Sequence, residues 1–134
     1  MGGSASTPAS GRSGERTTPD RVILEIRTYH VRSGMRDEFG RRMAAVAPML
    51  ERHGIDIVWM GGSEADDEHF VLLRSFDSLE AREAREDAFY DSDEWVHGPR
   101  EGIVGLIETY HTVVVSSTDA VVAALRESLR GSKA

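Results

Sequence analysis

The order of strand-like and helix-like segments is the feature of this sequence that most limits its fold. Four segments are rich in β-branched and aromatic side chains, which favour strands, and two carry apolar residues at helical spacing. The strands are expected over 22–31, 55–60, 69–76 and 104–115, and the helices over 35–53 and 77–90. This β-α-β-β-α-β order predicts an α+β, ferredoxin-like fold in which a four-stranded antiparallel sheet packs two helices on one face.

Both predicted helices carry signals at their ends. The first is followed by Gly54, which predicts the end of the helix. Glycine readily adopts the left-handed backbone conformation typical of a helix C-terminus. The second begins beside Asp77 and Ser78, either of which can accept a hydrogen bond from a backbone N–H of the first turn. The apolar stripe of the first helix consists of Phe39, Met43, Val46 and Leu50.

The two ends of the chain differ from its middle. Residues 1–20 are mostly Gly, Ser, Thr and Pro, so they cannot bury enough apolar surface to offset the entropy lost on ordering, and we expect a disordered tail. Residues 118–130 predict an extra amphipathic C-terminal helix, capped by Thr118 or Asp119. The expected organisation is a tail over 1–20, an α+β domain over 21–115, and a C-terminal helix and tail over 116–134.

Composition narrows the partners and the location. The net charge is −7, from 23 acidic and 16 basic residues, so the surface repels phosphate backbones and no nucleic-acid partner is expected. The absence of cysteine excludes disulfides, thiolate nucleophiles and cysteine-ligated metals. No apolar run approaches the ~18 residues needed to cross a bilayer, so no membrane partner is expected. These features fit a cytoplasmic location.

The first predicted strand carries two unlike rows of side chains, because successive strand residues point to opposite faces. The polar row is Glu25, Arg27 and Tyr29, and the apolar row is Val22, Leu24 and Ile26. We expect the apolar row to lie under the two helices and the polar row to lie on the bare face. A second copy related by a two-fold axis would cover that face. The prediction is a homodimer whose two sheets enclose a chamber lined by the polar row of both subunits.

Three stretches occur in an order and spacing typical of one known family. They are EIRTYHVRSGMRDEF (25–39), PMLERHGIDIVW (48–59) and VLLRSFDSLEAREAREDAFYDSDEW (71–95). Together they resemble the NIPSNAP family of the dimeric α+β barrel superfamily, and the likeness covers residues 22–114. The resemblance implies this barrel and a homodimer. The wider superfamily includes cofactor-free monooxygenases, haem-degrading enzymes, isomerases and cyclases, so the fold does not select one activity.

The polar row of the first strand supplies the main catalytic candidates. A carboxylate can take a proton, and a guanidinium can hold a carboxylate or enolate oxygen with two hydrogen bonds. We assign Glu25 as general base, Arg27 as anion binder and Tyr29 as hydrogen-bond donor. His97, in an irregular segment that could cover the chamber, is the candidate second acid.

The same charges also allow a structural interpretation. Glu25 and Arg27 could pair with each other, or with Arg74 and Glu108, as interface electrostatics. Removing one partner of a buried pair would then unfold the protein rather than inactivate it.

Further candidates concern binding. The substrate-binding candidates are Trp59, Arg74, Trp95 and Tyr110. Trp59 and Trp95, with Phe89 and Tyr90, could line a flat aromatic pocket, although such spacing is more often ordinary core. The alternating charges of EAREARED, within the second helix, are interpreted as a solvated face. No metal-binding spacing occurs, so we expect neither a metal nor a cofactor.

The leading functional hypothesis is a small, cofactor-independent enzyme. It would act by acid/base chemistry, as an isomerase, cyclase or monooxygenase-like enzyme, on an oxygenated small organic molecule in a biosynthetic or catabolic pathway. Two alternatives remain. One is a non-catalytic ligand-binding or interaction dimer, and the other is a haem-binding or haem-degrading protein that uses His97.

Overall fold

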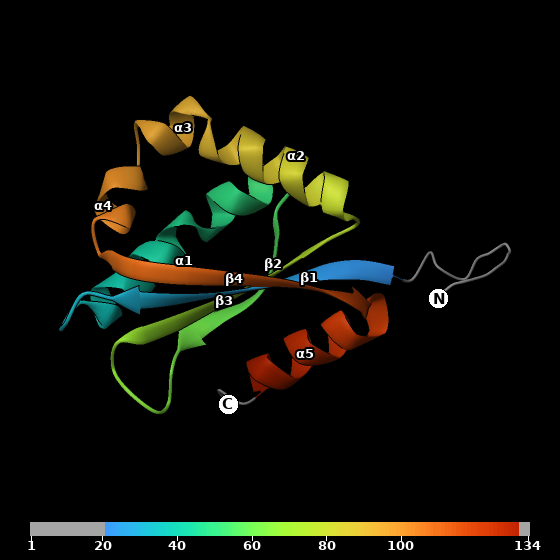
Figure 1. Ribbon diagram of the computed structural model, residues 1–134, viewed down its shortest axis with the longest axis horizontal. Helices are drawn as coiled ribbons and strands as arrows, with labels where there is room; N and C mark the ends of the chain where they lie inside the picture. Colours follow the sequence, from blue (N-terminus) through green and yellow to red (C-terminus); the bar gives the residue numbers. More distant parts are fainter. Residues whose placement is uncertain (1–20, 132–134) are drawn as a thin grey trace, which may run out of the picture.

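The computed structural model describes residues 21–131 (Figure 1). The predicted tail over 1–20 lies outside this range. The strands are β1 (Arg21–Val31), β2 (Asp56–Gly62), β3 (His69–Phe76) and β4 (Ile107–Thr118). The helices are α1 (Arg36–Arg52), α2 (Leu79–Tyr90), α3 (Asp93–Val96), α4 (Arg100–Val104) and α5 (Asp119–Gly131). Within these residues, no helix combines the length and apolar character needed to span a bilayer.

The four strands form one antiparallel sheet in the order β2-β3-β1-β4. This arrangement confirms the predicted α+β fold with an extra C-terminal helix. The register places Glu25 opposite Arg74, Arg27 opposite Thr112 and Tyr29 opposite Tyr110. The sheet therefore brings polar and aromatic side chains from three strands together on one face, since directly paired residues point the same way.

The local signals at the helix ends have physical counterparts in the structure. Gly54 has φ +83°, and the following N–H of Ile55 donates to the Leu50 carbonyl at 3.1 Å. Ser78 is the N-cap of α2, because its hydroxyl accepts from the Ala81 N–H at 3.0 Å. Both predicted helix ends are thus confirmed.

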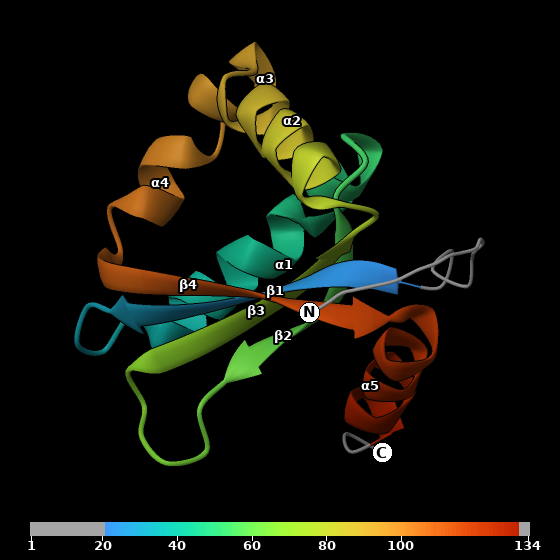
Figure 2. The same ribbon diagram turned by 45° about the vertical axis from the view of Figure 1, so that its right-hand side comes forward.

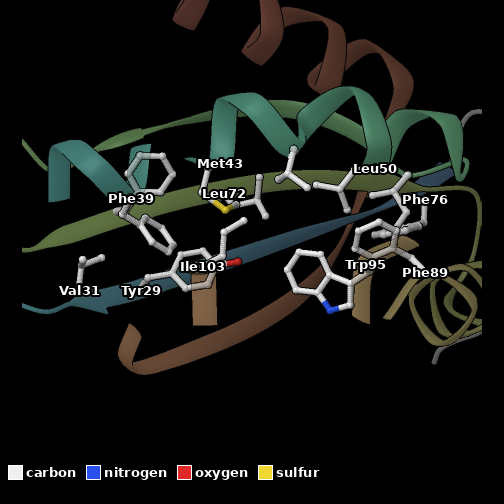
Figure 3. Packing of buried hydrophobic residues seen from close by; sticks show 13 residues of the cluster. Tyr29, Val31, Phe39, Met43, Leu50, Leu72, Phe76, Phe89, Trp95 and Ile103 are labelled. Carbon is white, nitrogen blue, oxygen red and sulfur yellow. The ribbon is translucent and has the colours of Figure 1, made fainter. Parts of the chain in front are cut away.

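The molecule has three layers, with α1–α4 on one face of the sheet and α5 on the other (Figures 1 and 2). The main core lies between the sheet and α1–α4, where Phe39, Phe89 and Val31 are fully buried. Figure 3 shows how side chains from β1, β3 and the covering helices meet in this layer. This core forms the frame of the candidate site.

A second, smaller core lies under α5. Val122 packs there against Val22, Leu24 and Val58. The Thr118 hydroxyl caps α5 by accepting from the Val121 N–H at 3.2 Å. In addition, Arg126 donates to the Ile57 carbonyl at 2.7 Å and to Asp56 at 2.9 Å, which ties α5 to β2. The predicted C-terminal helix is therefore an integral cover of the sheet.

The prediction of which strand row faces the helices is wrong. Glu25 and Tyr29 are buried beneath α1 and α2, and the apolar row containing Leu24 lies on the opposite face. The alternation itself is correct, but the polar row is the one under the helices because an ion-pair network compensates its charges. A chamber between two apposed sheets would consequently not be lined by the polar row.

Candidate functional site

A cavity of about 560 Å³ lies between the sheet and the covering helices. Its size is within the range of small-molecule sites. One end is polar, and most of the remaining wall is aliphatic or aromatic. The lining residues are Arg27, Tyr29, Met43, Val46, Leu50, Leu72, Glu86, Asp87, Phe89, Tyr90, Asp91, Trp95, Arg100, Ile103, Val104, Ile107 and Tyr110.

Behind the polar end lies a buried ion pair between adjacent strands. Glu25 and Arg74 both have 0% exposed side chains. Arg74 Nε donates to Glu25 Oε1 at 2.6 Å, and Arg82 Nε of α2 donates to the other oxygen at 2.9 Å. A buried carboxylate requires a cationic hydrogen-bond donor at each oxygen. An unpaired charge in the core lowers the free energy of unfolding by several kcal/mol, on the order of 3–5.

A second carboxylate, Glu86, connects this pair to the cavity. Its Oε2 accepts from Arg74 Nη2 at 2.9 Å, and its Oε1 lies 3.8 Å from Arg27 Nη2. The side chains of Glu86 and Arg27 are each only 13% exposed, and both line the cavity. Three guanidinium groups thus surround two carboxyl groups, which leaves a local surplus of positive charge in an acidic chain.

The two carboxyl groups have opposite pKa shifts. Burial alone would raise the pKa of Glu25, but hydrogen bonding with Glu86 and Arg74, and the charges of Arg74 and Arg27, lower it. For Glu86, burial and then the hydrogen bond to Glu25 raise the pKa to about 7, against the opposing charges of Arg74 and Arg27. Two nearby carboxyl groups whose pKa values separate in this way typically differ in role. Glu86 is therefore the one that can exchange a proton near neutral pH.

Arg27 is held in place from several sides. Its Nε donates to the Thr112 hydroxyl at 3.0 Å, and its Nη1 lies 3.5 Å from the Tyr90 oxygen. Its guanidinium also lies 5.1 Å from the centre of the Tyr110 ring. A guanidinium fixed in this way is suited to binding an anionic oxygen in a defined orientation.

Tyr29 and Tyr90 both line the cavity close to Arg27. Burial, followed by the charge of Tyr90, raises the pKa of Tyr29 to about 12. The Tyr90 oxygen accepts from Arg74 Nη1 at 3.0 Å, so its own hydrogen can be donated to a ligand. Trp95, 5.5 Å from Tyr90 between ring centres, continues an aromatic wall.

The structure brings together only part of the predicted site. Among the candidates, Arg27, Tyr29, Trp95 and Tyr110 line the cavity. Glu25 and Arg74 do not line it and instead form the buried pair behind it. The structural interpretation named this pair and the pair of Glu25 with Arg27, whose Nη2 lies 3.6 Å from Glu25 Oε2, but it placed them at a dimer interface. Here they lie inside one chain, and the further partners are Arg82 and Glu86 rather than Glu108.

The other two candidates lie elsewhere. The His97 side chain is 77% exposed and is not part of the cavity wall. Trp59 packs in the second core, on the face under α5. No histidine lines the cavity within residues 21–131, and no group of three or more histidine, aspartate or glutamate side chains in that range is arranged to hold a metal ion.

The main functional residue that sequence reasoning missed is Glu86. The interpretation of EAREARED as a solvated face is wrong for Arg82 and Glu86, which point toward the sheet. Their spacing contains the signal, because Arg82, Glu86 and Tyr90 recur every fourth residue, and the fully buried Phe89 is three residues after Glu86. Charged residues at this spacing can be predicted to face inward only when a neighbouring residue on the same helix face, here Phe89, is recognised as buried.

The fold and the cavity together define an α+β protein with a four-stranded antiparallel sheet and a cavity of small-molecule size. The sequence matches the NIPSNAP family over residues 24–119, more than half of its length. The chain therefore belongs to the NIPSNAP family.

Solved structures share this fold. A NIPSNAP family protein with unknown function from Agrobacterium tumefaciens has 21% identity and a TM-score of 0.66, with 72% of this chain and 88% of that chain covered. An uncharacterized NIPSNAP domain protein from Burkholderia xenovorans has 19% identity and a TM-score of 0.61, with 69% and 91% covered.

The likeness extends beyond NIPSNAP structures. A protein from Nitrosomonas europaea named "Putative antibiotic biosynthesis monooxygenase" has 13% identity and a TM-score of 0.58, with 73% of this chain and 91% of that chain covered. At these identities the likeness shows a shared fold alone. A comparison with curated protein sequences finds no match.

Proposed function

We propose that this protein is a cofactor-independent enzyme that moves protons on an oxygenated small organic acid bound in the cavity. The observation that carries the proposal is the pairing of Glu86, whose pKa is raised to about 7, with Arg27 at the polar end of a mostly apolar cavity. An acid/base group is most effective when its pKa lies near the working pH. The distant likeness to the Nitrosomonas europaea protein is compatible with such chemistry.

The proposed reaction begins with an anionic or carbonyl oxygen of the substrate on Arg27. Glu86, as a carboxylate, removes a proton from the carbon next to the carbonyl group, and the electron pair of that C–H bond moves into the enolate. Arg27 and the O–H of Tyr90 stabilise the enolate oxygen. Glu86, now protonated, returns the proton to another atom of the substrate, which gives an isomerisation without net oxidation.

Glu25 and Arg74 act as positioning residues in this proposal. After burial, the hydrogen bond to Glu25 and the charge of Glu25 help to keep the pKa of Glu86 high. Arg74 holds both carboxyl groups and Tyr90. The former assignment of Glu25 as the base is thus replaced by Glu86, which lines the cavity.

The test uses probes that carry the required groups. Phenylpyruvate, 4-hydroxyphenylpyruvate and benzoylacetate each combine a carboxylate, an aromatic ring and an acidic C–H bond. Proton NMR should detect deuterium incorporation from solvent faster than in buffer. Glu86→Gln should lower that enzyme-dependent rate by at least ~100-fold, the usual size of an acid/base contribution.

The matched control is Glu83→Gln, on the exposed side of the same helix, which should leave the exchange rate unchanged. Binding of the probes without any enhanced exchange would contradict the proposal and favour the non-catalytic ligand-binding alternative. The haem alternative loses its basis in His97, because that side chain is not part of the cavity wall.

We also propose that the protein is a homodimer joined through the part of β4 that α5 leaves exposed, on the sheet face opposite the cavity. Val113 and Val115 of β4 are 56% and 39% exposed there, beside Ile26 and Leu24 of β1. Exposed apolar surface of this kind is typical of an interface. A chain of 14.8 kDa should therefore have about twice this mass by sedimentation equilibrium.

A charge on this exposed part of β4 should separate the protomers. Val113→Glu should give the mass of one chain, whereas Val121→Glu, at an exposed valine on α5, should not. Wild-type protein that has the single-chain mass across the whole concentration range would exclude the dimer.

A further inference from the structure

A second cavity, of about 480 Å³, lies between α1 and the segment that follows α3, next to the first cavity, which we call the sheet-side cavity. We call the second cavity the outer groove. It is formed by α1 and by the turn and short helix that follow α3. Its lining residues are Arg42, Ala45, Val46, Met49, Gly98, Pro99, Gly102 and Ile103.

The two cavities share part of their walls. Val46 of α1 and Ile103 of α4 line both, and their side chains are only 4% and 3% exposed. No other residue lines both cavities among those described over 21–131. The wall shared by the two cavities, which we call the divide, therefore consists of one aliphatic side chain from each of two helices.

One side of this divide belongs to the short helix α4. Helix α4 has five residues, and the Arg42 Nη1 bond to the Gly102 carbonyl, at 3.0 Å, links it to α1. Side-chain rotation of Ile103, or a small shift of α4, would join the two cavities.

The outer groove has the chemistry of an apolar subsite. Ala45, Met49 and Pro99 offer carbon surface. The only charged side chain, Arg42, is already engaged, because its Nε donates to Glu38 at 2.7 Å in addition to the bond with Gly102. In the sheet-side cavity, Arg27 is buried and faces the ligand space. The anionic end of a ligand therefore belongs inside, and an uncharged end belongs in the outer groove.

We infer that the two cavities form one extended binding site for an amphipathic substrate: an oxygenated, anionic head at Arg27 and an unbranched apolar chain that passes between Val46 and Ile103 into the outer groove. The inference rests on the proposed function for the placement of the head. It adds the substrate class, an aromatic or enolisable acid with an alkyl chain, which the fold alone does not define.

The test is a chain-length series of 4-n-alkylbenzoates from unsubstituted benzoate to 4-octylbenzoate. The chain contains two tryptophans, so Trp59→Phe leaves Trp95, in the sheet-side cavity, as the single fluorescent reporter. Affinity should rise about fourfold per added methylene, the equivalent of ~0.8 kcal/mol, until the outer groove is filled.

Two variants identify the path of the chain. Val46→Phe, which thickens the divide, should remove the gain from long chains. Val58→Phe is the matched control, because Val58 is equally buried but lies under α5. If Val46→Phe does not fold, Met49→Gln serves the same purpose, since Met49 lines only the outer groove.

The outcomes separate the two proposals. Benzoate binding with no gain from longer chains would overturn the extended site and leave the proposed function intact. A gain that survives both Val46→Phe and Met49→Gln would also overturn it, because the chain would then lie elsewhere. If no member binds in an Arg27-dependent way, tested with Arg27→Gln, the anion site itself is wrong and both proposals fail.

Discussion

The two faces of the sheet are covered in different ways. Under α1–α4, the central strands contribute Glu25 and Arg74, both fully buried, and the floor of a cavity. Under α5, β1 contributes Val22 and Leu24 to an apolar cluster, and the ion pair between Arg126 and Asp56 on that side is partly exposed. One face thus has a buried ion-pair network beside a cavity, whereas the packing on the other face is mainly apolar.

The difference shows where this fold can place chemistry. A purely apolar layer stabilises the sheet without requiring exact partners, since aliphatic side chains of suitable volume can replace one another at modest cost. A layer with buried charges requires every partner, and those fixed charges then define an electrostatic environment for a ligand. The candidate site therefore lies on the face where charged groups are buried and each of them needs a partner.

Removal of Arg74 should have the largest effect on this comparison. Arg74→Ala leaves Glu25 buried without its closest partner and should lower the free energy of unfolding by about 3–5 kcal/mol. Urea denaturation measures the loss. The double variant Glu25→Leu with Arg74→Met should recover most of it, because both charges are then absent. A loss below 1 kcal/mol for Arg74→Ala would mean that the buried pair is not a strong constraint.

The pH dependence of stability should reveal the raised pKa of Glu86. In the folded state its pKa is above the ordinary 4.5, so between about 4.5 and 7 the folded chain holds a proton that the unfolded chain has released. Stability therefore falls as pH rises through this window, by about 1.4 kcal/mol per pH unit and roughly 3 kcal/mol in all. Glu25, with a lowered pKa, has the opposite sign, because its contribution is present above 4.5 and is lost as pH falls below that value.

Denaturation at pH 5 and pH 8 separates the Glu86 contribution from other titrating groups. Glu86→Gln should gain stability relative to wild type at the higher pH, and Glu83→Gln should not. Parallel pH profiles for wild type and Glu86→Gln would argue against a raised pKa.

The smallest effect is expected on the other face. Arg126 joins α5 to Asp56 through an ion pair whose Arg126 side chain is 30% exposed. Arg126→Ala should therefore cost only ~1 kcal/mol or less, with no change in ligand affinity. A cost equal to that of Arg74→Ala would remove the distinction between the two faces.

Much of the fold could be predicted from the sequence, because its signals are local. The alternation in β1, the glycine after α1 and the Ser78 cap are each set by neighbours within a few residues. Strand β4 was placed three residues too early, since α4 and its flanking turn occupy the segment that precedes Ile107. Boundaries of this kind depend on packing rather than on propensity.

The site was only partly predictable, because it depends on which face each row meets. When helices cover both faces of a sheet, the apolar and polar rows of a strand do not by themselves predict which helices each row meets. Hydrophobicity favoured Leu24 under the helices, but ion pairing from Arg82 and Glu86 on α2 reversed the choice. Those partners are more than 50 residues from Glu25, so no local pattern contains the information.

The Glu25–Arg74 pair has one more consequence, which concerns how the sheet aligns during folding. A two-residue slip between β1 and β3 would keep every side chain on its present face, so hydrophobic patterning alone does not oppose it. Such a slip would place Glu25 opposite Leu72 or Phe76 instead of Arg74 and would strand a carboxylate in apolar surroundings. The ion pair thus selects the native register of β1 and β3. A shifted register that a pair of all-aliphatic strands would tolerate is destabilised here by the unpaired carboxylate.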